Sequence, residues 1–271
     1  MKQSLIIIML ITMSLLVGCA KPETILTSST AIPTLTLAPT QTPECHEPGA
    51  LVTDEVLFAN TGGNHSIMVY LPPCYAENPS AAYPVLYWAN GNFWWQQLYD
   101  TTDRLTDRGD VPAFITVLIQ IDPNKGYGAD AQIVNDVVPY IDSHYRTKPD
   151  RLHRSITGFS NGAAIAIRAA FQAPTVFSRV AVLSGGIANG EQEKFTHWIS
   201  VMPSDQRPEV LIDVGDQDVI VFLTHYLMDL LDTLNYSYTF VHGPGDHTSE
   251  YTDEHLENIL KWLMTAYPET P

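Results

Sequence analysis

Basic residues are scarce in this sequence. Lys and Arg number 14 against 30 Asp and Glu, which leaves a formal net charge of −16 at pH 7. A surface of this sign repels a phosphate backbone rather than capturing it. We therefore expect no nucleic acid partner, and the acidity indicates little else about a ligand.

Several functional patterns are also absent from the chain. It has no Gly-rich phosphate-binding loop and no His or Cys cluster at zinc spacing. It also lacks a heptad or solenoid repeat. We therefore expect no metal and no cofactor. The 271 residues, 45% of them apolar, are enough for one domain with an ordinary buried core.

The N-terminus carries a short apolar segment behind a basic start. Lys2 precedes an apolar stretch at residues 5–17, which is too short to be a good membrane span. The stretch ends in Leu-Val-Gly-Cys at residues 16–19, which resembles a bacterial lipobox. The pattern predicts an export signal over residues 1–18 and a lipid on Cys19, holding the protein at the outer face of the bacterial cell membrane. A plain signal peptide with a chance cysteine is the alternative.

Cysteine is otherwise rare, since only Cys45 and Cys74 remain after Cys19. An even pair in an exported chain predicts a disulfide between them, with two free thiols as the alternative. Residues 19–44 are rich in Thr, Ser and Pro, a composition typical of a disordered spacer. The folded domain is therefore expected over residues 45–268.

Apolar runs and turn residues predict alternating strands and helices over this domain. A hairpin is expected from strands at residues 51–60 and 64–71 around a Thr-Gly-Gly turn. The next runs, at residues 83–89 and 113–121, are nearly continuously apolar, which is typical of a sheet covered on both faces. The further expected elements are a helix at 131–145, a strand at 155–157, a helix to 170, strands at 180–184 and 210–214, a helix at 219–234, a strand at 237–241 and a helix at 253–264. This order predicts an α/β fold with a mainly parallel, doubly wound sheet and an antiparallel N-terminal hairpin, which places ligands beyond the carboxyl ends of the strands.

The run Gly-Phe-Ser-Asn-Gly at residues 158–162 matches the pattern Gly-x-Ser-x-Gly. It lies between an expected strand and an expected helix. That context is typical of a nucleophile elbow, in which the serine occupies a strained turn and the glycines avoid clashes. Ser160 is therefore the predicted nucleophile, and an N-cap hydroxyl is the alternative role.

In folds with this elbow, the acid and the histidine follow the serine along the chain. Five histidines do so here. His247 falls in the polar loop after the last expected strand, where it can be aimed at the serine, and His242 at the end of that strand is its rival. His225 and His255 fall in expected helices, and His197 falls in a segment expected to be irregular. His247 is the predicted base.

Three carboxylates surround the end of the expected strand at residues 210–214. Asp213 lies within the strand, Asp216 at the following turn and Asp218 beyond it. The base needs a carboxylate that holds its tautomer and stabilises the imidazolium. Asp218 is the predicted acid because it lies far enough beyond the strand for the chain to turn back toward the histidine loop. Asp216 is its rival, and helix capping is the alternative role for either.

An oxyanion hole requires backbone N–H donors. One is expected from Asn161, the residue after the serine, and the other from the loop Asn-Gly-Asn-Phe at residues 90–93. Within that loop Asn92 is the expected donor and Phe93 the alternative.

Aromatic residues follow this loop closely. Phe93, Trp94, Trp95 and Tyr99 predict an aromatic platform for a sugar or an aryl-acyl group, and core or lid packing is the alternative.

These residues together resemble the esterase family of α/β-hydrolases, which includes S-formylglutathione hydrolases, feruloyl esterases, enterochelin esterases and mycolyltransferases. The resemblance runs from about residue 62 to 262. It is carried by the motifs at residues 83–87, 138–142, 154–162, 177–180 and 213–218. It implies an α/β-hydrolase fold, with Asp218 as the acid and His247 as the base. One departure is Asn90-Gly91, where the family usually reads His-Gly.

The sequence thus predicts a serine esterase that acts outside the cell through an acyl-enzyme on a small-molecule or polysaccharide ester. Two alternatives remain at this point. In the first, the acyl group of the acyl-enzyme is passed to a sugar hydroxyl instead of water. In the second, the domain is a catalytically silent, carbohydrate-binding lipoprotein on a hydrolase scaffold.

Overall fold

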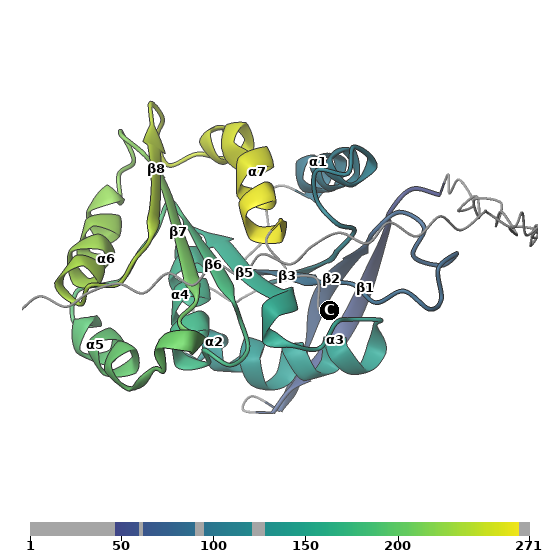
Figure 1. Ribbon diagram of the computed structural model, residues 1–271, viewed down its shortest axis with the longest axis horizontal. Coiled ribbons are helices and arrows are strands. Elements are labelled where there is room, and N and C mark those ends of the chain that lie inside the picture. Colours follow the sequence, from purple (N-terminus) through teal and green to yellow (C-terminus); the bar gives the residue numbers. More distant parts are fainter. Residues whose placement is uncertain (1–46, 60–61, 90–94, 121–127, 266–271) are drawn as a thin grey trace, which may run out of the picture. The chain divides into compact units, whose positions relative to one another are not determined.

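The chain divides into two units, residues 1–43 and 44–271. A computed structural model describes residues 47–59, 62–89, 95–120 and 128–265, all of which belong to the second unit (Figure 1). None of the helices in these ranges is long and apolar enough to cross a membrane. The predicted export signal, the spacer, Cys19 and Cys45 lie outside the described residues.

An eight-stranded sheet forms the centre of the described part of this unit, in the order β1-β2-β4-β3-β5-β6-β7-β8. The strands are β1 (Ala50–Phe58), β2 (Gly63–Leu71), β3 (Val85–Ala89), β4 (Ile115–Ile119), β5 (Arg154–Phe159), β6 (Arg179–Leu183), β7 (Glu209–Gly215) and β8 (Thr239–Gly243). The hairpin β1-β2 is antiparallel and joins β4 antiparallel, whereas β3 to β8 pair in parallel. The predicted mainly parallel sheet with an antiparallel N-terminal hairpin is confirmed.

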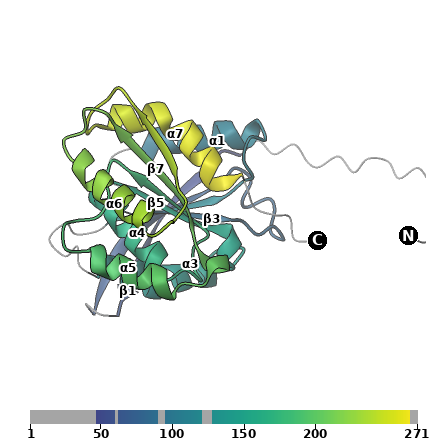
Figure 2. The same cartoon turned by 60° about the vertical axis from the view of Figure 1, so that its left-hand side comes forward.

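Helices cover both faces of the sheet, as Figure 1 and the turned view in Figure 2 show. They are α1 (Trp95–Asp107), α2 (Ala129–Gln132), α3 (Val138–His144), α4 (Asn161–Gln172), α5 (Gln192–Val201), α6 (Val221–Thr233) and α7 (Ser249–Met264). One face packs against α1 and α7, and the other packs against α2 to α6. Strands β3, β4 and β6 are buried along their whole length, because a sheet covered on both sides has no solvated face.

Two separate apolar cores result from the alternation of side chains along each strand. In β3, Leu86 and Trp88 join the core beneath α1 and α7, whereas Val85 and Tyr87 join the core on the opposite face. Successive side chains of a strand point to opposite faces, so one short apolar run supplies both layers.

Two helices go beyond the sequence predictions. α1 follows the expected oxyanion loop, and α5 occupies the segment expected to be irregular, so the expectation for His197 is wrong. The helix expected at residues 131–145 is divided into α2, a π-helical turn at Ile133–Val137 and α3. β8 begins two residues later than expected.

Tyr99 does not contribute to an exposed aromatic platform. Its residue is 8% exposed and its ring stacks on that of Tyr70, with 4.2 Å between the ring centroids. The packing alternative therefore holds for this residue, because the ring is part of the core beneath α1 and α7.

A charge network centred on Glu257 links α7 to α1. The carboxylate accepts hydrogen bonds from Arg104 of α1, from Arg108 directly after that helix and from Lys261, one turn further along α7. Hydrogen bonds from Arg104, Lys261 and Arg108 lower the pKa of Glu257 from 4.5 to about 2. The network thus joins the two helices that cover one face of the sheet.

We predict that Glu257→Gln makes the fold less sensitive to acid. The folded-state pKa of Glu257 is depressed, so its ionised form stabilises the native chain above about pH 4.5, and this contribution is lost as the pH falls toward about 2. Because these groups are solvent-screened, the melting temperature at pH 7 should fall by less than about 4 °C. In thermal melts at low salt, the difference in melting temperature between wild type and variant should roughly halve from pH 5 to pH 3. A difference that is unchanged over this range would contradict the assignment.

Candidate active site

Ser160 occupies a sharp turn between β5 and α4. Its backbone has φ 56° and ψ −119°, a region that residues other than glycine rarely adopt. Its N–H donates to the carbonyl of Leu183 in the neighbouring strand β6 at 2.9 Å. The Ser160 side chain makes no capping hydrogen bond to α4, so the N-cap alternative does not describe it.

The two glycines beside this turn allow the backbone to pass closely. A Cβ atom at Gly158 would lie 2.4 Å from the carbonyl carbon of Gly162, and one at Gly185 would lie 2.8 Å from the carbonyl oxygen of Ser160. Real Cβ atoms do not approach other atoms so closely, because the van der Waals radii overlap. Glycine is therefore required at both positions for α4 to begin directly above the sheet.

His247 lies in the loop after β8, and its imidazole reaches the serine. The His247 Nε2 atom is 2.9 Å from Ser160 Oγ. The imidazole also contacts the ring of Phe159, with 4.7 Å between centroids. The side chain is 24% exposed, so part of the imidazole is open to solvent. A neutral Nε2 in this position can accept the serine proton.

Asp218 completes a chain of hydrogen bonds. Its two oxygens lie 3.1 and 3.0 Å from His247 Nδ1, and the Ile220 N–H donates to Oδ1 at 2.8 Å. The Asp218 side chain is fully buried. A buried carboxylate held on Nδ1 leaves Nε2 as the acceptor that faces the serine. The structure thus brings together Ser160, His247 and Asp218, the three residues selected from the sequence.

The loops that carry the acid and the histidine are bonded to each other. The N–H of Gln217 donates to the carbonyl of Gly245, and the N–H of Gly245 donates to the Gln217 side chain, both at 2.8 Å. A Cβ at Gly215 would lie 2.4 Å from the Gly245 carbonyl oxygen. The two loops are therefore joined directly to each other.

The rival residues form a different pair. His242 Nδ1 lies 2.8 Å from Asp216 Oδ1, and both side chains are about half exposed, at 57% and 43%. The geometry thus places the rival base and the rival acid on each other rather than on Ser160. His197 and His225 lie on α5 and α6.

Asp213 pairs with His255, a contact that the sequence reasoning missed. His255 Nδ1 lies 2.9 Å from Asp213 Oδ2, and the Tyr251 hydroxyl donates to Oδ1 at 2.8 Å. The available signal was the four-residue spacing of Tyr251 and His255, which places both on one side of a helix.

The expected oxyanion donors are described in part. Asn161 is the first residue of α4, so its N–H is one of those that a helix leaves without an acceptor in its own backbone. Asn92, Phe93 and Trp94 lie outside the described residues, and Trp95 begins α1. Within the described ranges, no group of three or more His, Cys, Asp or Glu residues is arranged to hold a metal ion.

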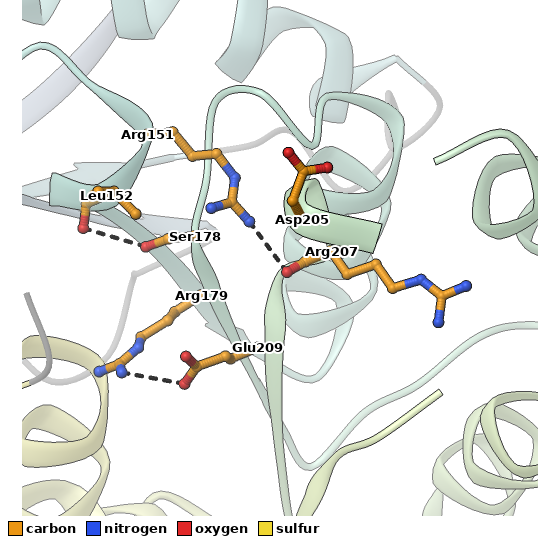
Figure 3. A pocket seen from close by; sticks show the side chains of 7 residues that line it. All are labelled: Arg151, Leu152, Ser178, Arg179, Asp205, Arg207 and Glu209. Carbon is orange, nitrogen blue, oxygen red and sulfur yellow. Dashed lines mark hydrogen bonds and ion pairs between the residues drawn. The ribbon is translucent and has the colours of Figure 1, made fainter. Parts of the chain in front are cut away.

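A pocket of about 310 Å³ opens at the opposite edge of the sheet, where β5, β6 and β7 begin (Figure 3). Arg179 is bonded there to Glu209 at 3.1 Å, and Arg151 donates to the carbonyls of Pro174 and Arg207. Because these strands are parallel, Ser160 lies at their other end. The pocket is therefore separate from the candidate active site.

The architecture and the elbow define a class of protein. A strand, a sharp turn bearing serine and a helix, followed along the chain by the acid and then the histidine, are characteristic of the α/β-hydrolase fold.

A family model with the description "Putative esterase" matches residues 59–220. The chain belongs to this esterase family and is a carboxylic ester hydrolase. It is also 22% identical over 185 residues to YbbA, an uncharacterised protein of Bacillus subtilis (strain 168), in a match that covers 60% of this chain and 72% of that protein.

Solved structures show the same fold. A ferulic acid esterase is similar at a TM-score of 0.72 and 20% identity, covering 82% of this chain and 100% of its own. A mutant of the feruloyl esterase module from Clostridium thermocellum, complexed with sinapinate, has a TM-score of 0.69 and 19% identity over 84% and 92% of the two chains. An S-formylglutathione hydrolase from Staphylococcus aureus has a TM-score of 0.64 and 17% identity over 81% and 97%. The predicted α/β-hydrolase fold is confirmed.

Proposed function

We propose that the protein hydrolyses carboxylic esters through a covalent acyl-enzyme on Ser160. The observation that carries this proposal is the continuous chain of hydrogen bonds from Ser160 Oγ through the His247 imidazole to the buried Asp218 carboxylate. A serine hydroxyl is a weak nucleophile on its own, and a base in contact with it removes its proton as it attacks.

The reaction proceeds in two halves. Ser160 Oγ attacks the ester carbonyl carbon while its proton passes to His247 Nε2, and the carbonyl oxygen becomes an oxyanion beside the Asn161 N–H. The bond to the alcohol oxygen then breaks, and His247 gives its proton to the departing alcohol. Water next attacks the acyl group and passes a proton to His247. The acid leaves as Ser160 recovers that proton.

Asp218 acts through the imidazole. Because its carboxylate is buried and holds Nδ1, it keeps the proton on that nitrogen and stabilises the imidazolium formed during each half-reaction. The second oxyanion donor is assigned to the backbone of Asn92, with Phe93 as the alternative.

Labelling with a fluorophosphonate tests the nucleophile. The wild-type chain should be labelled and Ser160→Ala should not. The variant should also have a kcat about a millionfold lower, because no other group takes over the attack. Ser178→Ala is the control, since this serine lies at the opposite edge of the sheet. Failure of the wild type to react would favour the silent carbohydrate-binding protein.

A pair of neighbouring substitutions tests the acid. Asp218→Asn should lower kcat about ten-thousandfold, because an amide favours the wrong tautomer of His247. Asp216→Asn removes the same charge two residues away, from an exposed pair with His242, and should change kcat less than about twofold. Both are measured with p-nitrophenyl acetate. Equal losses in the two variants would refute the assignment of Asp218.

We further propose that the substrates are aryl-acyl esters of carbohydrates. The support is twofold: similar solved structures are named as ferulic acid and feruloyl esterases, one of them complexed with sinapinate, and the aromatic residues Phe93, Trp94 and Trp95 follow the expected oxyanion loop. An aromatic ring stacks favourably on such side chains.

A panel of esters tests this choice. A feruloylated sugar should be hydrolysed with a kcat/KM at least about tenfold above that of p-nitrophenyl octanoate, since a pocket shaped for an aryl group binds a flexible chain poorly. Acetylated sugar serves as the control for the carbohydrate part. Preference for the octanoate would contradict the proposal. Acylated acceptor sugar among the products would indicate acyl transfer in place of hydrolysis.

We also propose that the enzyme works outside the cell, anchored by a lipid on Cys19 and carrying a disulfide between Cys45 and Cys74. The support is the N-terminal sequence, with its basic start, short apolar stretch and Leu-Val-Gly-Cys ending. An anchored surface enzyme reaches polymers that cannot enter a cell.

Fractionation tests the anchor. In a bacterial host the wild type should sediment with membranes, and Cys19→Ser should move most of the protein into the soluble fraction, because the thioether-linked lipid cannot form. Cys74→Ser is the control and should stay with the membranes. Membrane association that survives Cys19→Ser would rule out this lipid as the anchor.

A further inference from the structure

A second carboxylate and imidazole pair lies beside the catalytic residues. Asp213, near the end of β7, accepts hydrogen bonds from the Tyr251 hydroxyl at 2.8 Å and contacts His255 Nδ1 at 2.9 Å. The Tyr251 and His255 rings also touch, with 4.3 Å between centroids. We call these three residues the Asp213 cluster.

The Asp213 carboxylate is buried, and its residue is 3% exposed. Within the described part of the chain, no Arg or Lys side chain forms an ion pair with it. A buried charge is costly unless hydrogen bonds satisfy it, so Tyr251 and His255 are required partners. Burial and the hydrogen bond to Asp213 raise the pKa of the Tyr251 phenol, which therefore remains a hydrogen-bond donor throughout the working pH range.

Tyr251 lies directly against the loop that carries His247. A Cβ at Gly245 would lie 2.2 Å from Tyr251 Cδ2, so the phenol ring contacts the backbone there. Gly245 is also bonded to Gln217 in the loop that carries Asp218. The histidine loop therefore contacts both Tyr251 and the acid loop.

The main chain of Asp213 reaches toward the serine. The Asp213 carbonyl accepts the N–H of Ser184 at 2.7 Å. Leu183, which ends β6 directly before Ser184, accepts the N–H of Ser160 through its own carbonyl at 2.9 Å. The side chain of Asp213 thus holds the helix that supports His247, and its backbone is bonded next to the nucleophile turn. One residue links the supports of both reacting groups.

We infer that the Asp213 cluster is a set of positioning residues that fixes His247 Nε2 relative to Ser160 Oγ. This inference rests on the proposed function. In the part of the chain that the structure describes, Ser160 is hydrogen-bonded to His247 and not to any of these three residues, so they act through the histidine loop. A displacement of the imidazole by about 1 Å is enough to lower the rate about a hundredfold.

Tyr251→Phe tests the inference, because it removes the hydroxyl and keeps the ring that packs on Gly245. The number of active sites is titrated with a fluorophosphonate, and kcat is expressed per titrated site. We expect kcat to fall about tenfold to a hundredfold while KM changes less than about twofold, since proton transfer is impaired and ester binding is not. Thermal melting monitors the fold.

Two variants of His255 provide rescue. His255→Asn keeps an N–H donor near the position of Nδ1, whereas His255→Leu keeps only bulk. The Asn variant should retain a kcat at least about fivefold above that of the Leu variant. His242→Leu is the matched control, because it removes an exposed imidazole that pairs with a carboxylate outside the cluster, and it should leave kcat unchanged.

The outcomes separate the two proposals. If the wild type is not labelled, the proposed function fails and this inference fails with it. If the wild type is labelled and hydrolyses esters, but Tyr251→Phe and both His255 variants keep the wild-type kcat per site, the inference alone is overturned. A lower melting temperature with an unchanged kcat per site would assign the cluster to stability only and would also overturn it.

Discussion

Parallel pairing at the carboxyl edge of the sheet is the constraint on which the candidate active site depends. Phe159 at the end of β5 pairs with Leu183 of β6, Leu183 pairs with Asp213 of β7, and Asp213 pairs with Val241 of β8. The chain therefore leaves all four strands at one edge. The loops that follow β5, β7 and β8 carry the serine, the acid and the histidine. Backbone hydrogen bonds of the sheet thus bring together side chains that are 87 positions apart in the sequence.

Buried carboxylates at this edge are satisfied by imidazoles. Asp218 faces His247 and Asp213 faces His255, and both aspartates are 3% exposed. An imidazole donates a hydrogen bond to a carboxylate and still exchanges a proton near neutral pH, which a guanidinium does not. The third partner distinguishes the two pairs. In the first pair, His247 is also hydrogen-bonded to the Ser160 hydroxyl. In the second, Asp213 also accepts a hydrogen bond from the Tyr251 phenol, which packs on the histidine loop.

Sequence reasoning missed two helices, α1 and α5. Helix α1 contains three threonines, which are poor helix formers, and the apolar residues that it buries include Leu98, Tyr99 and Leu105. It is stabilised by packing against the sheet and by the charge network with Glu257 of α7. In α5, Phe195 and Ile199 form a short apolar stripe that is buried only because the other helices of that face surround it. Burial against the rest of the fold stabilises both helices, and a short stretch of sequence gives no information about that burial.

The sequence by itself determined the sheet type and the elbow, because both depend on neighbouring residues. Continuous apolar strands require cover on both faces, and two glycines around Ser160 permit a turn that side chains would block. It also narrowed the acid and the base to a few candidates by their order along the chain. Only the tertiary structure decided which carboxylate meets which imidazole. Asp216 and Asp218 are two residues apart, yet Asp216 is half exposed and faces His242, whereas Asp218 is buried and faces His247. That choice depends on how two loops from different strands pack together, which no single segment encodes.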